Sequence, residues 1–157
     1  TWLNKTSLIL SGVGLFYGVN MAFSNDSDLL NILPDILGFG IDSFSTEHAK
    51  AQADIERHIR AVWWDQRGYS GELKPALLTD SQWTRANSYL VLWKYALPQL
   101  TNWVDGDRFQ GMIDFYKSRY NEELEACFKD GVSYDANDDG TVDEAERTPI
   151  NDGRLVR

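Results

Sequence analysis

The residues whose types and spacing could do chemistry lie near the C-terminus, in the run DANDDGTVDEAE from Asp135 to Glu146. Aligned from Asp135, the run matches the twelve-residue calcium loop of an EF-hand, with Gly140 at the sharp turn and Val142 as the apolar residue that packs inward. The predicted ligands occupy loop positions one, three, five, seven, nine and twelve, namely Asp135, Asn137, Asp139, Thr141, Asp143 and Glu146. A hard cation takes such oxygen-only ligands, so the spacing predicts a calcium site.

The sequence around this loop differs from that of an EF-hand. The preceding helix is expected to end near residues 129–131, several residues before the loop, and Pro149 stops any helix that follows it. One interpretation is bound calcium in a structural role; the other is an empty, solvated loop held by its own Asx-type hydrogen bonds. A regulatory role would need a second helix to open a groove, and the sequence does not supply one.

The acidity of the chain is local. The 157 residues carry a net charge of −9, and seven of the 24 acids lie between Asp130 and Glu146 with no base among them, which leaves 17 acids against 15 bases elsewhere. With no cluster of Lys and Arg, the chain is poorly suited to gripping a phosphate backbone, although it could line a passage through which DNA slides. The single Cys127 excludes an intramolecular disulfide and is expected to be buried.

Four helical segments must position the loop. They are residues 26–40, which Pro34 should bend or split; 46–67; 80–97, with Thr79 and Gln82 at capping-box spacing and Pro98 ending or kinking the helix; and 107–128. Their wide apolar stripes predict an all-α fold, a small antiparallel bundle. We expect an apolar N-terminal arm at residues 1–23, the bundle at 24–131, and the acidic loop with a C-terminal arm at 132–157. Most aromatic residues are expected in the core, and some of the six Trp at protein contacts.

The N-terminal stretch has two interpretations. Lys5 followed by an apolar run resembles a secretory signal, but three Gly interrupt the run and no A-x-A-like site follows it. The uncharged stretch from Thr6 to Asn25 is barely long enough to span a bilayer. The alternative is an extended arm that packs on a neighbouring chain.

The sequence offers no recognisable active site. His48 and His58 have no Cys or His at ligand spacing, and there is no G-x-S-x-G, H-E-x-x-H or P-loop. We therefore expect a binding or assembly role rather than an enzyme.

The order of features resembles the head-tail connector (adaptor) proteins of tailed bacteriophages. The residues that carry the resemblance are an apolar DLL helix, AKAQADIERHIRAVWW leading into RGY, RANSYLVLWKYAL, FYKSRYNEELEACFKDGVSYDANDDG, and a tail ending GRLVR. The resemblance covers residues 24–157 and implies a helical protein of the virion neck, assembled in the host cytoplasm. It further implies a ring, usually of twelve subunits, between the portal protein and a stopper or tail protein, around a DNA conduit and without a membrane.

By this resemblance, the C-terminal arm reaches into the portal, and the portal-facing residues are Arg154, Leu155, Val156 and Arg157. From the residues alone, the same segment can equally be a frayed tail. The alternative function is a secreted or surface-attached calcium-binding interaction module, in which the N-terminal stretch is an export signal and the loop is the working site.

Overall fold

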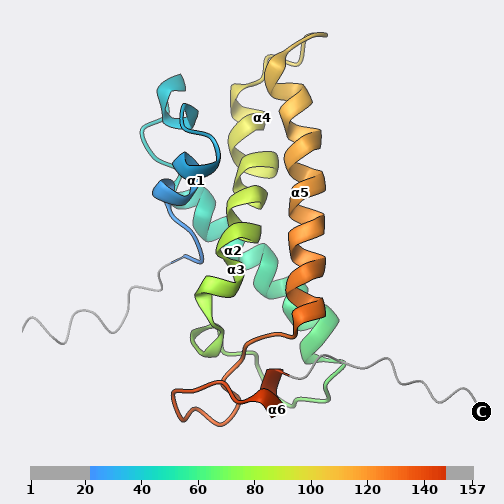
Figure 1. Cartoon of the computed structure of the whole chain (residues 1–157). Helices are drawn as coiled ribbons and strands as arrows, with labels where there is room; N and C mark the ends of the chain where they lie inside the picture. The colour runs from blue at the N-terminus through green and yellow to red at the C-terminus, as the bar shows by residue number, and fades with distance from the viewer. Residues whose placement is uncertain (1–21, 148–157) are drawn as a thin grey trace, which may run out of the picture.

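The computed structural model describes residues 22–147, and within them the chain forms an elongated bundle of helices (Figure 1). The first helix, α1 (Asp26–Ile32), begins at a capping box: the Asn25 side chain accepts a hydrogen bond from the Ser27 N–H, and the Asp28 side chain accepts one from the Asn25 N–H, both at 2.8 Å. Pro34 then separates α1 from the short 3₁₀ helix η1 (Ile36–Phe39), as predicted.

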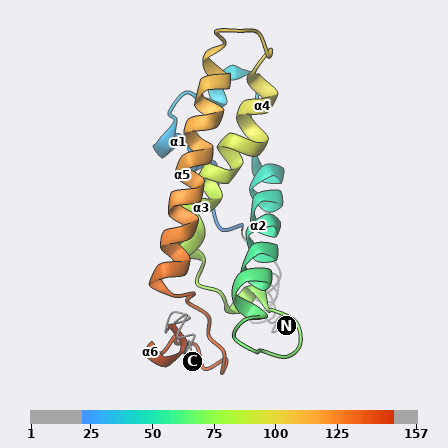
Figure 2. The ribbon, with the colours of Figure 1, turned by 90° about the vertical axis from the view of Figure 1, so that its right-hand side faces the viewer.

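Three long rods make up the rest of the bundle. They comprise α2 (Ser45–Ile59) with η2 (Arg60–Trp64); α3 (Asp80–Leu90) with η4 (Val91–Ala96) and α4 (Leu97–Leu100); and α5 (Arg108–Asp130). Consecutive rods run antiparallel, so the first and third rods run in the same direction (Figure 2). The 3₁₀ turn η3 (Pro75–Leu77) lies between the first and second rods, and α6 (Glu144–Arg147) closes the described chain. The prediction of a small all-α bundle is therefore confirmed.

Two of the rods contain a wide π-helical turn that the sequence analysis did not predict. At the end of η2, the Asp65 N–H donates to the Arg60 carbonyl at 3.2 Å, five residues back. At the end of η4, the Leu97 N–H donates to the Leu92 carbonyl, also five residues back. Pro98 then lies in the first turn of α4, and the rod ends at Leu100. Pro98 therefore does not end the helix at once, because the wide turn precedes it.

The helix starts were predicted with mixed success. Asp107 caps α5, since its side chain accepts from the Phe109 N–H at 3.0 Å. The capping box predicted at Thr79 and Gln82 is wrong, because the Thr79 side chain makes no cap hydrogen bond. The Gln82 amide instead donates to the Gly131 carbonyl at 2.7 Å and accepts from the Ser133 N–H at 2.8 Å. This side chain joins α3 to the segment after α5 rather than closing its own helix.

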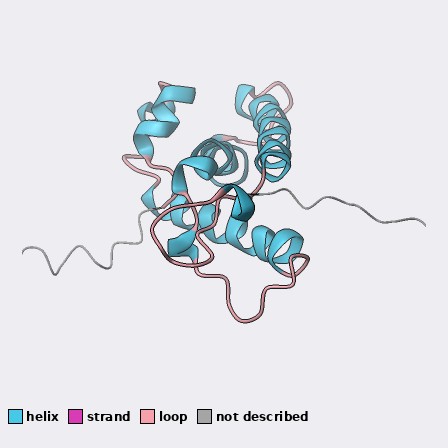
Figure 3. Cartoon of the chain, turned by 60° about the horizontal axis from the view of Figure 1, so that its bottom comes forward, coloured by secondary structure: helices cyan, strands magenta, loops and turns pink. Residues whose placement is uncertain are grey.

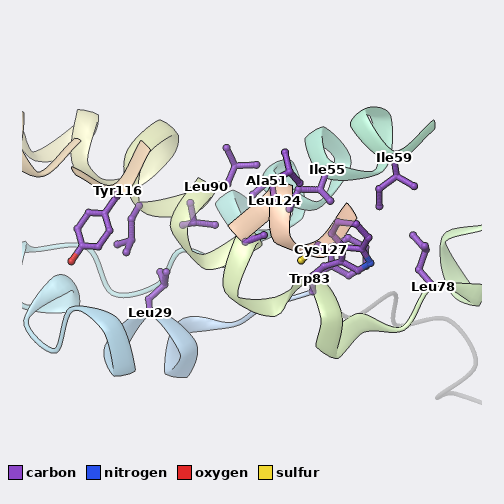
Figure 4. Close-up of a cluster of buried hydrophobic side chains, with 14 of the residues drawn as sticks. Leu29, Ala51, Ile55, Ile59, Leu78, Trp83, Leu90, Tyr116, Leu124 and Cys127 are labelled. Carbon is purple, nitrogen blue, oxygen red and sulfur yellow. The ribbon is translucent and has the colours of Figure 1, made fainter. Parts of the chain in front are cut away.

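The core lies between the rods (Figure 4). Ile55 and Ile59 of α2, Trp83 and Leu90 of α3, and Leu124 of α5 are buried there. Cys127 is also buried, as predicted, and its thiol donates to the Gln82 carbonyl at 3.2 Å. Burial raises the pKa of this thiol to about 11, so Cys127 is protonated at neutral pH.

The two ends of the bundle differ. The turn between α4 and α5 lies at one end, and α6 with the acidic loop lies at the other (Figure 2). When the α6 end comes forward, loops can be seen gathered beneath the helices (Figure 3). The candidate site is therefore at one tip of an elongated molecule.

Candidate metal centre

The acidic loop is attached to the bundle by a short antiparallel pairing. Residues 132–135 leave α5 and run beside residues 77–79, which lead into α3, with an isolated bridge between Tyr134 and Leu78. The Thr79 N–H donates to the Ser133 carbonyl, and the Asp135 N–H donates to the Leu77 carbonyl, both at 3.0 Å. The backbone of the first predicted ligand, Asp135, is therefore fixed by the framework and not by the loop alone.

An aromatic cluster, formed by Trp63, Trp64, Tyr69 and Tyr134, supports this pairing. Trp64 stacks on Tyr69 with ring centroids 4.5 Å apart, and Tyr134 meets Trp64 edge to face at 5.3 Å. Trp63 lies 5.7 Å from Tyr134 and 5.3 Å from Tyr69. Such arrangements contribute beyond the area that the rings bury. The cluster therefore holds the residue immediately before the loop against the end of the first rod.

Asp135 organises the first half of the loop. Its carboxylate accepts from the Asp139 N–H at 3.1 Å and from the Gly140 N–H at 2.8 Å. Gly140 has a φ of +89°, which glycine adopts without steric cost, and Asp138 has a φ of +58°. The sharp turn predicted at Gly140 is present.

Glu146 closes the second half of the loop. One of its carboxylate oxygens accepts from the Ala136 N–H at 3.0 Å and from the Asn137 N–H at 3.3 Å, and the other accepts from the Asp143 N–H at 2.8 Å. An Arg67 guanidinium nitrogen donates to the Glu146 carbonyl at 3.1 Å. The first and last predicted ligands thus hold different peptide groups of the same loop, and Arg67 ties the closed loop to the bundle.

The middle positions of the loop are exposed and bonded among themselves. Asp139 accepts from the Thr141 N–H at 2.9 Å and the Thr141 hydroxyl at 2.7 Å, and these hydrogen bonds hold the pKa of the Asp139 carboxyl below its usual value. The side-chain oxygen of Asn137, Oδ1, accepts from the Asp139 N–H at 3.0 Å. Asp143 is exposed as well.

The donor set suits a hard cation in kind and in order along the chain. Asp135, Asn137, Asp139, Asp143 and Glu146 offer only oxygen ligands to an ion, and the loop is already turned at Gly140. In the structure the side-chain oxygens of Asp135, Asn137, Asp139 and Glu146 bind peptide N–H groups, and within residues 22–147 no three His, Cys, Asp or Glu side chains converge as a metal-binding group. Binding an ion therefore requires Glu146 to exchange its N–H partners for the ion. The predicted portal-facing residues 154–157 lie outside the described residues.

A buried polar network at the other side of the bundle was missed by the sequence analysis. The Ser24 hydroxyl and His48 Nδ1 are 2.6 Å apart, the Asn87 amide donates to the Ser24 hydroxyl at 2.8 Å, and His48 Nε2 lies 3.3 Å from an Asp26 carboxylate oxygen. Because the Ser24 oxygen accepts from Asn87, its own proton goes to Nδ1, which leaves the His48 proton on Nε2, facing Asp26.

The residue types of this network are those of a Ser-His-Asp triad, but their surroundings do not suit nucleophilic catalysis. Ser24 and His48 are only 3% and 2% exposed, and the Ser24 hydroxyl already has two partners. A nucleophile must reach its substrate. The network instead fastens residues 22–28 to α2 and α3, together with a hydrogen bond of 3.1 Å from the Phe23 N–H to the Gln52 side chain.

None of the described helices combines the length and apolarity that a bilayer crossing requires. Comparison with known protein families, with curated proteins and with solved structures found no match to this chain.

Proposed function

We propose that this chain is a structural protein of the bacteriophage neck, an adaptor that forms a ring between the portal and a stopper or tail protein. The observation that carries the proposal is that the two ends of the elongated bundle present different surfaces. The acidic loop and the start of the C-terminal segment share one end, and the α4–α5 turn with its exposed Trp103 occupies the other (Figure 1). A protein that joins two different partners needs two separate surfaces, and such a molecule offers one at each end.

The acidic loop has a specific role in this proposal. It follows the longest described helix and ends one residue before Arg147, where the described chain stops and the C-terminal segment begins. Arg67 and the aromatic cluster fix the loop to the bundle. We infer that calcium, bound by Asp135, Asn137, Asp139, Thr141, Asp143 and Glu146, stiffens this corner and sets the direction in which the portal-facing residues leave the bundle.

The charge of the chain fits a conduit for DNA. The net charge of −9 lies mostly between Asp130 and Glu146, and the chain has no cluster of Lys and Arg to grip a phosphate backbone, so DNA could pass a ring of such subunits without being retained. Subunits of such a ring would contact one another through heterologous surfaces repeated around an axis.

Imaging of purified particles by cryo-electron microscopy tests the proposal. We expect density for this chain as a closed ring directly beneath the portal; particles whose neck lacks the chain would refute the adaptor role. A monomeric chain in isolation would not contradict it, because docking on the portal can complete the contacts between subunits.

A second measurement tests the portal-facing residues. Deleting residues 154–157 should abolish binding to purified portal and leave the helical circular-dichroism signal unchanged. The control is Asn151→Ala, which alters the same segment but keeps the last four residues. Unchanged binding by the deletion variant would remove the docking role of this segment.

The second candidate function is a secreted or surface calcium-binding interaction module, favoured by the closed geometry of the acidic loop alone. Export processing would remove the N-terminal stretch, whereas a virion protein would keep it. The intact mass of the protein isolated from its natural source distinguishes these two functions.

A further inference from the structure

The turn between α4 and α5, residues 101–107, exposes a large aromatic side chain in an unfavourable backbone conformation. Trp103 has a φ of +59°, in the left-handed region, and it shares positive φ with only one other described non-glycine residue, Asp138. Its side chain is 63% exposed, and Val104 next to it is 59% exposed. Bulky residues are rare in this conformation because their Cβ crowds the backbone. Burial of the indole in the bundle does not compensate for the strain.

The conformation is imposed by hydrogen bonds within the turn. The Asp107 carboxylate accepts from the Thr101 hydroxyl, from the Asn102 N–H at 2.9 Å and from the Phe109 N–H at 3.0 Å. The Trp103 N–H donates to the Thr101 hydroxyl at 3.1 Å. The turn is closed by the Asp107 N–H, which donates to the Val104 carbonyl at 3.0 Å. The indole is therefore presented by a pre-organised turn.

Phe115 is also a strongly exposed aromatic residue, but unlike Trp103 its ring contacts neighbouring side chains. An Arg119 guanidinium lies 5.2 Å from the Phe115 ring centroid, and Tyr116 meets the ring edge to face at 5.1 Å. Within residues 22–147, no aromatic ring or cation lies against the Trp103 indole. Trp103 is thus an exposed aromatic side chain without such a partner, carried on a hydrogen-bonded turn at the tip of the bundle.

We propose that the turn 101–107 is a protein-docking element whose anchor is Trp103, and that its partner offers an apolar pocket bordered by Lys or Arg. A turn whose backbone is fixed before binding loses less conformational freedom on docking, and Trp is enriched among the residues that dominate interfaces. The basic border of the pocket follows from charge, because the turn carries Asp105 and Asp107. The next base, Arg108, has its guanidinium over the Phe39 and Phe109 rings, 5.0 and 4.6 Å from their centroids.

The same charges disfavour two other binding partners of the turn. A second copy of the chain meeting tip to tip would oppose Asp105 to Asp105, and an anionic lipid surface would repel both carboxylates. The inference rests on the described residues alone, and it stands whether or not the chain is a phage adaptor.

The test begins by finding the partner of the full chain. A photo-cross-linking amino acid at position 104 leaves Trp103 in place, and mass spectrometry of the irradiated natural assembly maps the residues that it reaches. The identified protein is then purified, and its affinity is measured for the parent, for Trp103→Ala, for Trp103→Gly and for the control Phe115→Ala. Circular dichroism checks that each variant is folded.

We expect cross-links to one protein, at an apolar pocket with Lys or Arg beside it. Both Trp103 variants should bind at least about thirtyfold more weakly, as for a dominant interface residue, and Phe115→Ala should bind within about threefold of the parent. Asp105→Asn and raised salt should each weaken binding several-fold. Cross-links only to copies of this chain, only to lipid, or to nothing would overturn the proposal, as would parental affinity in the Trp103 variants. A partner that is not a virion protein would contradict the adaptor function but support the docking element. A neck ring in which no protein contacts the turn 101–107 would support the adaptor function but contradict the docking element.

Discussion

Tyr134 meets Trp64 edge to face, with ring centroids 5.3 Å apart and the ring planes at 75°, directly before the first carboxylate of the acidic loop. The two residues lie 70 positions apart in the sequence, one at the end of the first rod and the other after α5. The contact couples the loop to the packing of the bundle. Formation of the loop is therefore part of the folding of the bundle and not a separate event.

This coupling predicts that Tyr134→Ala destabilises the whole bundle. Tyr134 is 3% exposed and touches three aromatic rings, so truncation should lower the free energy of unfolding by about 3 to 5 kcal/mol, as for other large buried aromatic residues. Urea denaturation followed by circular dichroism measures it. Tyr134→Phe, which keeps the ring, should cost about 1 kcal/mol or less; equal losses in both variants would contradict a role for ring packing.

Calcium should stabilise the chain, and Glu146→Gln should remove most of the effect. Without an ion, the loop carboxylates repel one another by roughly 1 kcal/mol per close pair in water-like surroundings. We expect a dissociation constant on the order of 10⁻⁴ to 10⁻³ M for this single loop. The free energy of unfolding should then rise by about 2.7 kcal/mol at a hundredfold excess of calcium.

Thermal melting with calcium, with magnesium and with chelator measures this stabilisation. Glu144→Gln is the matched control, because it removes one carboxylate of the loop that is outside the predicted ligand positions. If calcium and chelator give the parent the same melting temperature, and calorimetry detects no binding at millimolar calcium, the loop is only a solvated turn.

The buried imidazole of His48 predicts a loss of stability in mild acid. Burial lowers the pKa of His48 from its usual value of 6.5, and the neighbouring Asp26 carboxylate opposes only part of this effect. The unfolded chain therefore binds a proton at a higher pH than the folded chain. The contribution of neutral His48 to the free energy of unfolding is fully present above about pH 6.5. It is lost as the pH falls from there toward the lower pKa of His48 in the folded chain.

Denaturation midpoints between pH 7.5 and pH 5 measure this dependence. His48→Gln should flatten the slope in that range, even if the variant is less stable overall. The carboxyl of Asp26, whose pKa is also lowered, titrates below its usual value of 3.8 and so acts outside this window. A parental slope in His48→Gln would mean that another group is responsible.

The strained turn predicts an unusual stability effect at Trp103. Glycine adopts a positive φ freely, so Trp103→Gly should leave the free energy of unfolding unchanged or raise it by about 1 kcal/mol. Trp103→Ala retains the Cβ clash and should show no such gain. Thermal and urea denaturation of both variants checks the difference; a Trp103→Gly protein clearly less stable than the alanine variant would show that the backbone is not strained.

The parts of the fold that follow from local rules were predictable. Apolar periodicity gave the long helices, Asn25 was among the cap candidates for α1, and the spacing from Asp135 to Glu146 identified the acidic loop. Thr79 and Gln82 show where such rules fail. Gln82 matches a capping box locally, but it satisfies the Gly131 carbonyl and the Ser133 N–H, groups about 50 residues away that no local pattern reveals.

The same limit applies to the polar network and to the aromatic cluster. His48 has no partner at short spacing in the sequence, because Ser24 and Asn87 come from other elements. Trp64 and Tyr134 likewise meet only after the rods have packed. Polar residues on the otherwise apolar face of a helix, such as His48 and Asn87, are the signal that could have suggested a buried network.

The wide turn at Val91–Ala96 has a consequence for how the second rod tolerates changes of length. A π-helical turn holds one more residue than an α-helical turn, so the loss of one residue there would close it to a regular turn and leave the segments on either side facing as before. The same loss in the middle of α5 would rotate every later residue by about 100° and carry Leu124 and Cys127 out of the core. Deletions of one residue should therefore be tolerated at Val91–Ala96 and rejected in α5.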